Sequence, residues 1–343
     1  MYSESEIDAA VAARVISPQD AAALRNFIAG QRAAPAVDEE QFRLLTGFND
    51  IFVSVALVLA LGAIAQIGWQ IAPWLGGAGV ALASWAAAEY FTRRRRMALP
   101  SILLLLGFVG AVAAVPIGVL VRLNPDWSNQ MNALVGAGIA LLAGGAAWLH
   151  WRRFHVPITV AAGTVAGVGV ALALAASLVK DPQGLVYPVA LAGGVATFAL
   201  AMAWDMSDRE RRTRRSDVAF WLHLAAAPLI AHPIFQLLGV FGREIGAAQA
   251  LLVLGLYLVF AFIALAIDRR ALLVSSLAYV LYAMAALFRQ AGAIELSAAL
   301  TALVIGSALL LLSVFWHPMR ARVVALLGSL QHRLPPVQVA VPA

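Results

Sequence analysis

Arg93-Arg-Arg-Arg-Met-Ala-Leu-Pro-Ser-Ile-Leu-Leu-Leu-Leu-Gly-Phe-Val-Gly-Ala-Val112 joins four consecutive arginines to a long apolar run. The apolar part does not alternate with polar residues, as the strands of a membrane barrel do. A helix needs about 20 apolar residues to cross the hydrocarbon core of a bilayer. Because similar runs recur along the chain, the sequence predicts a helical membrane protein.

The composition agrees with lipid as the main solvent of this chain. Of its 343 residues, 62% are apolar and 12% are charged, whereas soluble domains hold about 45–50% and about 25%. The mean hydropathy is +0.85. We therefore predict an all-α, polytopic integral membrane protein with about ten transmembrane helices. The predicted spans are residues 49–69, 72–92, 99–121, 132–151, 157–179, 185–204, 218–239, 247–267, 271–288 and 294–315.

Basic residues gather on one side of the predicted membrane domain. The N-terminal segment, the connections after the even-numbered spans and the C-terminal tail hold all of the 24 lysines and arginines except Arg122, Lys180, Arg243 and Arg289. This bias is typical of loops that stay in the cytoplasm. We therefore predict that both termini are cytoplasmic. The arginines expected at the anionic inner leaflet are Arg93, Arg94, Arg95, Arg96, Arg211, Arg212, Arg214 and Arg215.

Two shorter segments flank the predicted ten-helix domain, which spans residues 48–316. Residues 1–47 predict a small cytoplasmic helical segment, because Ser17-Pro18-Gln19-Asp20 has the spacing of a helix start. Helices this short need another surface to pack on, such as the membrane face or a soluble protein partner. Residues 317–343 follow a break at His317-Pro318 and mix arginine with aliphatic residues, so they predict a basic amphipathic surface helix and a tail.

Glycine is dense inside the predicted spans. Gly163 and Gly167 form a G-x-x-x-G pattern, and Gly193 and Gly194 are adjacent. Small residues let the backbones of membrane helices approach closely. One interpretation is the sliding helices of a transporter. The other, which we favour, is static close packing, because this pattern is a general packing device in membranes.

The seventh predicted span, residues 218–239, contains His223, His232 and Gln236. Ionisable groups at membrane depth are candidates for a transport pathway or a site. Nine residues separate the two histidines, so an α-helix directs them to opposite sides and they do not share one metal ion. Two interpretations stay open: a neutral histidine bonded to a neighbouring helix, or a polar pocket or proton route.

The same span contains two prolines, Pro228 and Pro233. Each proline lacks an N–H group and leaves the carbonyl four residues earlier, at Leu224 or Leu229, without its helical donor. Such carbonyls can line a cavity.

Other polar residues lie near the predicted span ends. Glu89 precedes Arg93 by four residues, so we expect an ion pair on one helix face. Asp205 and Asp268 lie beside arginines, where we expect pairing in the loops or with a helix dipole. Gln66 falls in the outer half of the first span. The candidate polar pathway comprises His223, His232, Gln236, Gln66 and Glu89.

Several classes of chemistry find no support in the sequence. Cysteine is absent, which excludes disulfides, thiolate metal sites and thiol catalysis. No phosphate-binding loop, nucleophile elbow, zinc-protease or dinucleotide motif is present, so no residues specify an enzyme, and we expect no cofactor and no metal. An enzyme that acts on lipid stays a third interpretation, which would need acid and base groups clustered at one membrane interface. The isoelectric point near 10.3 reflects arginines dispersed among loops, and without an aromatic and basic stripe we expect no nucleic-acid partner. The expected partner surface is the lipid bilayer.

Three segments resemble a group of uncharacterised multi-pass bacterial inner-membrane proteins. They are Asp205–Pro233, with its core Thr-Arg-Arg-Ser-Asp-Val-Ala-Phe-Trp-Leu-His, the arginine-rich Glu89–Pro100, and Trp148–Gly163. The resemblance implies an inner-membrane location and a multi-pass topology. It implies no catalytic residues, because that group has no established activity.

Two functions are compatible with these features. The first is a carrier or flippase for a small solute or lipid, with the seventh span lining its route. Ten spans with both ends inside is the layout of the drug/metabolite exporters, so residues 49–179 and 185–315 are geometrically possible inverted halves. The alternative is a non-transporting scaffold, sensor or assembly factor that acts through its N-terminal helices.

Overall fold

The computed structural model describes residues 4–32, 48–179, 182–209, 211, 213–239, 246–293 and 295–337, and all regular structure in these ranges is helical. The chain divides into two compact units, residues 1–41 with 336–343 and residues 42–335. The predicted all-α class is confirmed over the described residues.

The first unit contains α1 (Glu4–Ala12) and α2 (Pro18–Arg32). The amide of Asp20 donates to Ser17 Oγ at 3.0 Å, and the Ser17 hydroxyl donates to the Asp20 carboxylate at 2.5 Å. The predicted helix start is therefore confirmed. Arg25 of α2 pairs with Asp8 of α1 at 2.7 Å, which ties the two helices together. The remainder of the predicted segment, residues 33–47, lies outside the described residues.

In the second unit, nine described helices are long and apolar enough to span a membrane. This finding supports a membrane protein and agrees with nine of the ten predicted spans. The helices are α3 (Phe48–Ile71), α5 (Ala98–Leu123), α6 (Asn129–Phe154), α7 (Ile158–Leu178), α8 (Gln183–Ser207), α9 (Arg214–Leu237), α10 (Ala247–Ile267), α11 (Ala271–Gln290) and α12 (Ser297–Val314).

The remaining predicted span, residues 72–92, differs in the structure. It forms the 16-residue α4 (Pro73–Ala88), which continues without a break into the π-helix η1 (Glu89–Arg94). In η1 the Arg95 amide donates to the Tyr90 carbonyl, five residues earlier. The α-helical part alone is too short to span a bilayer of about 30 Å. The count of ten spans therefore stays a prediction.

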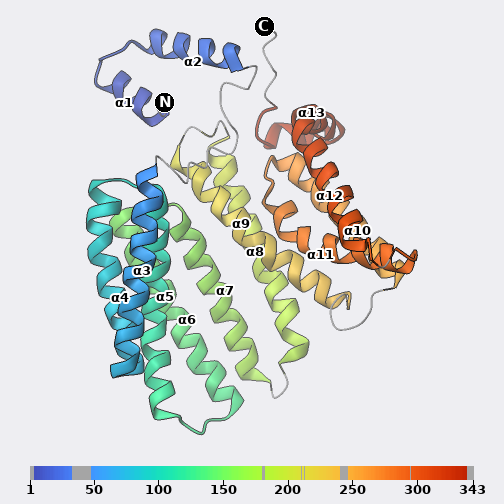
Figure 1. The fold of residues 1–343 in the computed structure, drawn as a ribbon. Coiled ribbons are helices and arrows are strands. Elements are labelled where there is room, and N and C mark those ends of the chain that lie inside the picture. Colours follow the sequence, from blue (N-terminus) through green and yellow to red (C-terminus); the bar gives the residue numbers. More distant parts are fainter. Residues whose placement is uncertain are drawn as a thin grey trace. The chain divides into compact units, whose positions relative to one another are not determined.

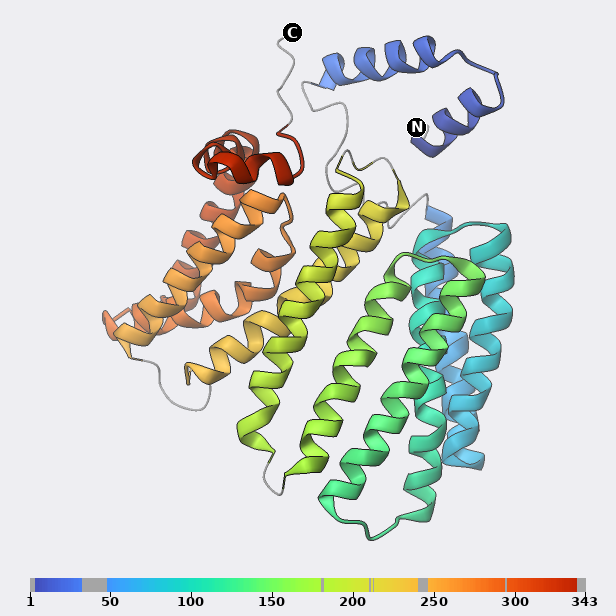
Figure 2. The same ribbon diagram turned by 180° about the vertical axis from the view of Figure 1, so that it is seen from behind.

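The helices of the second unit form two regions that meet at α8 and α9. The first region, α3 to α7, lies on one side of the α8–α9 pair, and α3 contacts both α4 and α5. The second region comprises α8 to α13, and its helices α10, α11 and α12 lie on the other side of that pair (Figures 1 and 2). The closest helix pairs are α4 with α5 and α6 with α7 in the first region, but α8 with α9 and α10 with α11 in the second. The two predicted inverted halves therefore pair their helices differently.

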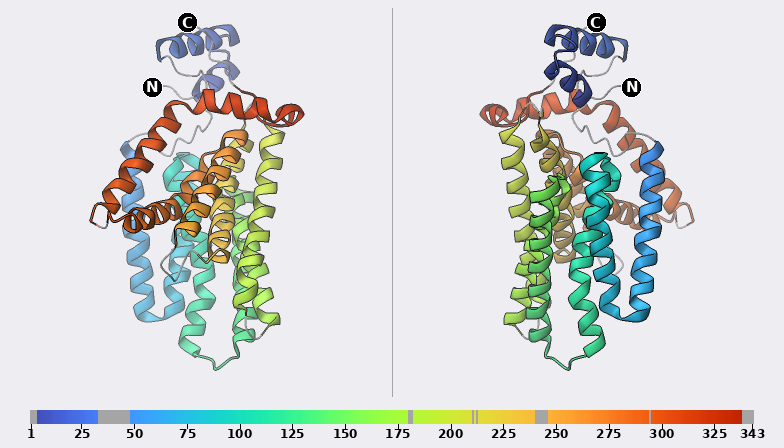
Figure 3. Two further views of the ribbon diagram at one scale, coloured as in Figure 1. Left: turned by 90° about the vertical axis from the view of Figure 1, so that its right-hand side faces the viewer. Right: turned by 90° about the vertical axis from the view of Figure 1, so that its left-hand side faces the viewer.

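The C-terminal helix α13 (Trp316–Leu326) begins earlier than the sequence predicts. The helix breaks at Phe315, and Pro318 lies inside the first turn of α13, where its missing N–H costs nothing. Helix α13 lies crosswise over one end of the second region (Figure 3), and a 3₁₀ turn, η2 (Gly328–Arg333), follows it. Trp316 is buried against α10 and α11, so α13 is anchored to the helical domain.

Glycine permits a close approach of α8 to α9, whereas in the G-x-x-x-G pattern of α7 only Gly163 has an atom of another helix, Ala147 Cβ, within contact distance of an added methyl group. A methyl group on Gly194 would lie 2.7 Å from the carbonyl oxygen of Leu229, whereas one on Gly167 would meet nothing within 4 Å. The Leu229 carbonyl is the one that Pro233 leaves without a helical donor. Gly194 therefore permits a close approach to the Leu229 carbonyl of α9, as static packing predicts.

Candidate functional site

Two buried carboxylates lie at one end of the second region. Asp205, near the end of α8, is 2% exposed, and Asp268, between α10 and α11, is 3% exposed. Two arginines, Arg269 and Arg320, are equally buried. Because a buried charge is costly unless it is paired, these groups have to meet. We call Asp205, Arg211, His223, Asp268, Arg269, Trp316 and Arg320 the charge network.

Asp205 is held by a forked interaction with Arg269. Arg269 Nη2 donates to Asp205 Oδ1 at 2.5 Å and Nε donates to Oδ2 at 3.2 Å. Such parallel contacts fix both the distance and the angle between the two groups. The same guanidinium also donates to the Ser216 carbonyl at 3.2 Å, in the first turn of α9. One side chain thus fastens the α10–α11 connection to both α8 and α9.

His223 completes the contacts of Asp205. Its Nε2 lies 2.8 Å from Asp205 Oδ2, and the imidazole is 1% exposed. The ring of Phe198 on α8 packs edge to face against it, with the ring centres 5.3 Å apart. The interpretation of His223 as bonded to a neighbouring helix is confirmed, because Asp205 belongs to α8. His223 Nδ1 has no hydrogen-bond partner among the described residues.

Asp268 forms the second centre of the network. Arg211 Nη1 donates to Oδ2 at 3.0 Å, Trp316 Nε1 donates to Oδ1 at 2.8 Å, and Arg320 Nε lies 3.3 Å from Oδ1. The backbone of Asp268 is left-handed, with φ of 60°. This turn ends α10 and directs Asp268 and Arg269 to different partners.

Further contacts extend the Asp268 centre toward the C-terminal part. Arg320 Nη2 donates to the Pro335 carbonyl at 2.7 Å, and the guanidinium of Arg270 lies over the Trp316 ring at 4.7 Å. The network therefore joins the end of α8, α9, the α10–α11 connection and α13. Its ion pairs hold these four elements together. It also contains one side chain, His223, of the type that ordinarily binds and releases a proton near neutral pH.

The second histidine of α9 lies apart from this network. His232 is exposed, and its Nδ1 lies 2.7 Å from the hydroxyl of Tyr279 on α11. The ring of Tyr187 on α8 lies 6.1 Å away, centre to centre. Gln236, one turn further along α9, is half-buried. The nine-residue spacing thus gives the two histidines different partners, as the sequence predicts.

The other two pathway candidates lie in the first region. Glu89 in η1 pairs with Arg93 at 3.2 Å, which confirms that predicted ion pair, and also with Arg153 of α6 at 2.7 Å. Gln66 is exposed on α3. The structure therefore distributes the five candidates over separate places, and the polar pathway stays a prediction. Over the described residues, no three histidine or acidic side chains gather as metal ligands.

The inner-leaflet arginines differ in their surroundings. Arg93 to Arg96, Arg214 and Arg215 are exposed, as expected for solvated or lipid-facing cations. Arg211 is not: its side chain is 9% exposed and pairs with Asp268. Arg212 lies outside the described residues.

Sequence reasoning missed most of the charge network. It assigned Asp205 and Asp268 to loop pairing and counted Arg269 as a loop cation, but all three are buried. It placed Arg320 on the membrane surface, whereas Arg320 is 1% exposed and points to Asp268 and Pro335. The one available signal is Asp268-Arg269-Arg270 itself, a charged tripeptide that separates two helices with almost no loop.

Comparison of this chain with family models, with curated proteins and with solved structures finds no match.

Proposed function

We propose that this protein is a carrier of the bacterial inner membrane for a small solute or lipid, and that the charge network closes its cytoplasmic end. The proposal includes ten spans, with α4 and η1 together as the second, and cytoplasmic termini. The positive-inside bias of the arginines supports this orientation. In this orientation the charge network lies at the cytoplasmic end of the helices.

The burial of the network is the observation that carries this proposal. In a permanently closed helix bundle, apolar side chains of similar volume hold helices at least as well as buried ion pairs do. Ion pairs differ in having discrete partners, so they support two alternative arrangements. Asp205, Asp268 and their arginines connect four separate elements at one end of the helices. Ion pairs that can exchange partners are suited to a gate that opens and closes.

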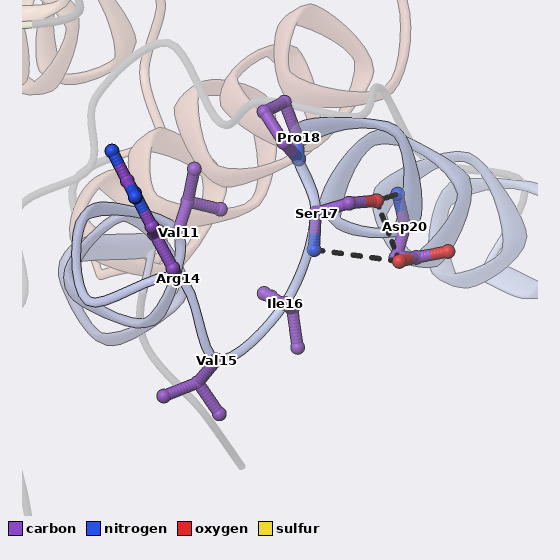
Figure 4. A pocket seen from close by; sticks show the side chains of 7 residues that line it. All are labelled: Val11, Arg14, Val15, Ile16, Ser17, Pro18 and Asp20. Carbon is purple, nitrogen blue, oxygen red and sulfur yellow. Dashed lines mark hydrogen bonds between the residues drawn. The ribbon is translucent and has the colours of Figure 1, made fainter.

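A second function is favoured by a different observation. The α1–α2 unit leaves Val15 75% and Phe27 63% exposed. An open concavity of about 580 Å³ lies at the turn between the helices (Figure 4). Exposed apolar residues beside a concavity are typical of protein contacts. This surface supports the alternative of a scaffold or sensor that binds a soluble partner.

Cysteine accessibility separates the two functions, because the natural chain contains no cysteine. Ala227 is fully buried near the middle of α9. We expect Ala227→Cys in proteoliposomes to react with a membrane-impermeant thiol reagent added from either side, because a carrier admits water to each side in turn. A closed scaffold would leave this cysteine unreactive from both sides, and that result would contradict the carrier.

Two further single cysteines serve as controls for this experiment. Leu59 lies in the middle of α3 and is 68% exposed, so Leu59→Cys should face lipid and stay unreactive. Asp126 lies in the exposed connection between α5 and α6. We expect Asp126→Cys to react only with reagent added from the periplasmic side. Reaction of Asp126→Cys from the cytoplasmic side would overturn the proposed orientation.

A further inference from the structure

His223 uses only one of its two ring nitrogens. Nε2 contacts Asp205, whereas Nδ1 is buried and has no partner within the described part of the chain. A neutral imidazole with its proton on Nε2 donates to the carboxylate and leaves on Nδ1 only a lone pair. An imidazolium has a donor on each nitrogen, so the closed arrangement offers nothing to its second N–H.

The charged groups around His223 are one acid, which favours a second proton on the imidazole, and two arginines, which oppose it. Asp205 on α8 is the acid that faces it, Arg269 comes from the α10–α11 connection, and Arg211 lies between α8 and α9. Arg269 already contacts both oxygens of Asp205. A proton on His223 would therefore add a third cation near a carboxylate that Arg269 has neutralised. Phe198, the aromatic neighbour on α8, supplies no lone pair.

We propose that the Asp205–His223 pair is a proton-binding site, and that a proton bound at His223 Nδ1 opens the cytoplasmic end of the protein. The step adds one proton from water to Nδ1 and breaks no covalent bond. It leaves a buried donor without an acceptor, and this donor is satisfied only when α9 separates from α8 enough to admit water. This inference rests on the proposed function, because it identifies what operates the gate of that carrier.

The test measures water access beside His223 as a function of pH. Ala219 is fully buried on α9, one turn from His223 toward the end with the charge network. In Ala219→Cys, we compare thiol labelling of the folded protein with labelling of the same variant unfolded in detergent, which cancels the pH dependence of the thiol itself. Between about pH 8 and about pH 5.5, a range that includes the ordinary titration of histidine, the ratio should rise.

The expected rise is several-fold, because an open state that binds the proton more tightly becomes increasingly favoured as the pH falls. In Ala219→Cys with His223→Gln, the amide still donates to Asp205 but does not titrate, so the ratio should stay at its pH 8 value. His150 provides the matched control, since it is another fully buried histidine, on α6. Ala219→Cys with His150→Gln should keep the full response.

Two results would overturn the proton site: a labelling ratio that does not change with pH, or a response that survives His223→Gln.

If His223→Gln does not fold, hydrogen exchange of the unmodified protein replaces the labelling of that variant. Amides of α8 and α9 around Asp205 and His223 should then exchange faster at acid pH while those of α3 to α7 do not, and equal behaviour in both regions contradicts the proposal. Two-sided labelling of Ala227→Cys remains a separate measurement, so failure of the carrier and failure of the proton site are distinguishable.

Discussion

Helices α3 to α7 and helices α8 to α13 differ in the burial of the charged groups that connect their ends. In the first region, backbones touch: a methyl group on Gly118 would lie 2.5 Å from Pro73, and one on Gly76 would lie 2.5 Å from the Ala65 carbonyl. In the second region, buried carboxylates and guanidinium groups connect the helix ends. The hydrophobic effect does not drive helices together inside lipid, and close backbone approaches occur in both regions, since Gly194 also meets Leu229 between α8 and α9. The buried acid–arginine contacts of the charge network belong to the second region.

The two buried histidines show the same contrast. His150 in the first region lies among the rings of Trp85, Phe108 and Phe154, with ring centres 4.6 to 6.3 Å away. His223 in the second region lies among charges. A ring cluster depends on contact area and changes gradually, whereas an ion pair has one partner or another. Groups that can exchange one partner for another therefore lie in the second region, where we propose the gate.

The largest effect is expected for Asp268→Asn. Asparagine retains the shape and accepts the left-handed backbone, but it removes the charge that Arg211 and Arg320 face. Removing one member of a buried ion pair costs about 3–5 kcal/mol, so thermal unfolding in detergent should occur at a clearly lower temperature. Asp126→Asn, at an exposed carboxylate, is the control and should not change it. Equal unfolding temperatures for the two variants would show that the network contributes no stability.

The next effect is expected for Gly194→Ala. The added methyl group would meet the Leu229 backbone at 2.7 Å, so α8 and α9 have to move apart at a cost of about 1–3 kcal/mol. Gly167→Ala is the matched control, because nothing lies within 4 Å of its new methyl group. We expect the temperature at which the folded peak is lost in size-exclusion chromatography to fall for Gly194→Ala but not for Gly167→Ala. A fall of the same size for Gly167→Ala would mean that helix propensity or lipid contact, and not the close approach, sets the result.

The membrane helices could be predicted because each depends on its own apolar run. A helix satisfies its backbone within about 20 neighbouring residues, so local composition is enough to find it. The exception is informative: residues 72–92 contain Glu89 and lead into the arginines, and there the helix changes to a π-helix. Local composition does not foresee that one-residue change in hydrogen bonding.

The charge network could not be predicted because its partners are distant in the sequence. Arg269 and Asp205 are 64 residues apart, and Trp316 and Asp268 are 48 apart. Several arginines lie close to each acid along the chain, and only the packing of α8, α9 and α13 selects among them. For His223 the sequence offered a bond to a neighbouring helix as one of two interpretations, because an ionisable group in an apolar span needs either a partner or a polar pathway.

A smaller effect is expected for the ion pair of the first region. Arg153→Gln removes the contact from α6 to Glu89, but Glu89 keeps Arg93. Both arginines and the acid are partly exposed, so water and salt screen the pair. We expect a small decrease in unfolding temperature at low salt that disappears at high salt. A decrease as large as that of Asp268→Asn would place a stabilising charge centre in the first region too, and the contrast between the regions would fail.

The smallest effect on topology is expected when Arg93 to Arg96 are replaced together by neutral residues. These four side chains are exposed, and they contribute to orientation only through the summed bias of many loops. Arginines of the other predicted cytoplasmic segments remain, so a reporter fused at this loop should still be cytoplasmic. A periplasmic reporter would show that this loop alone orients the protein.

Neutralising Arg269 tests the opposite case, because the side chain of this arginine is buried against Asp205. We expect its loss to decrease the amount of folded protein without inverting any helix.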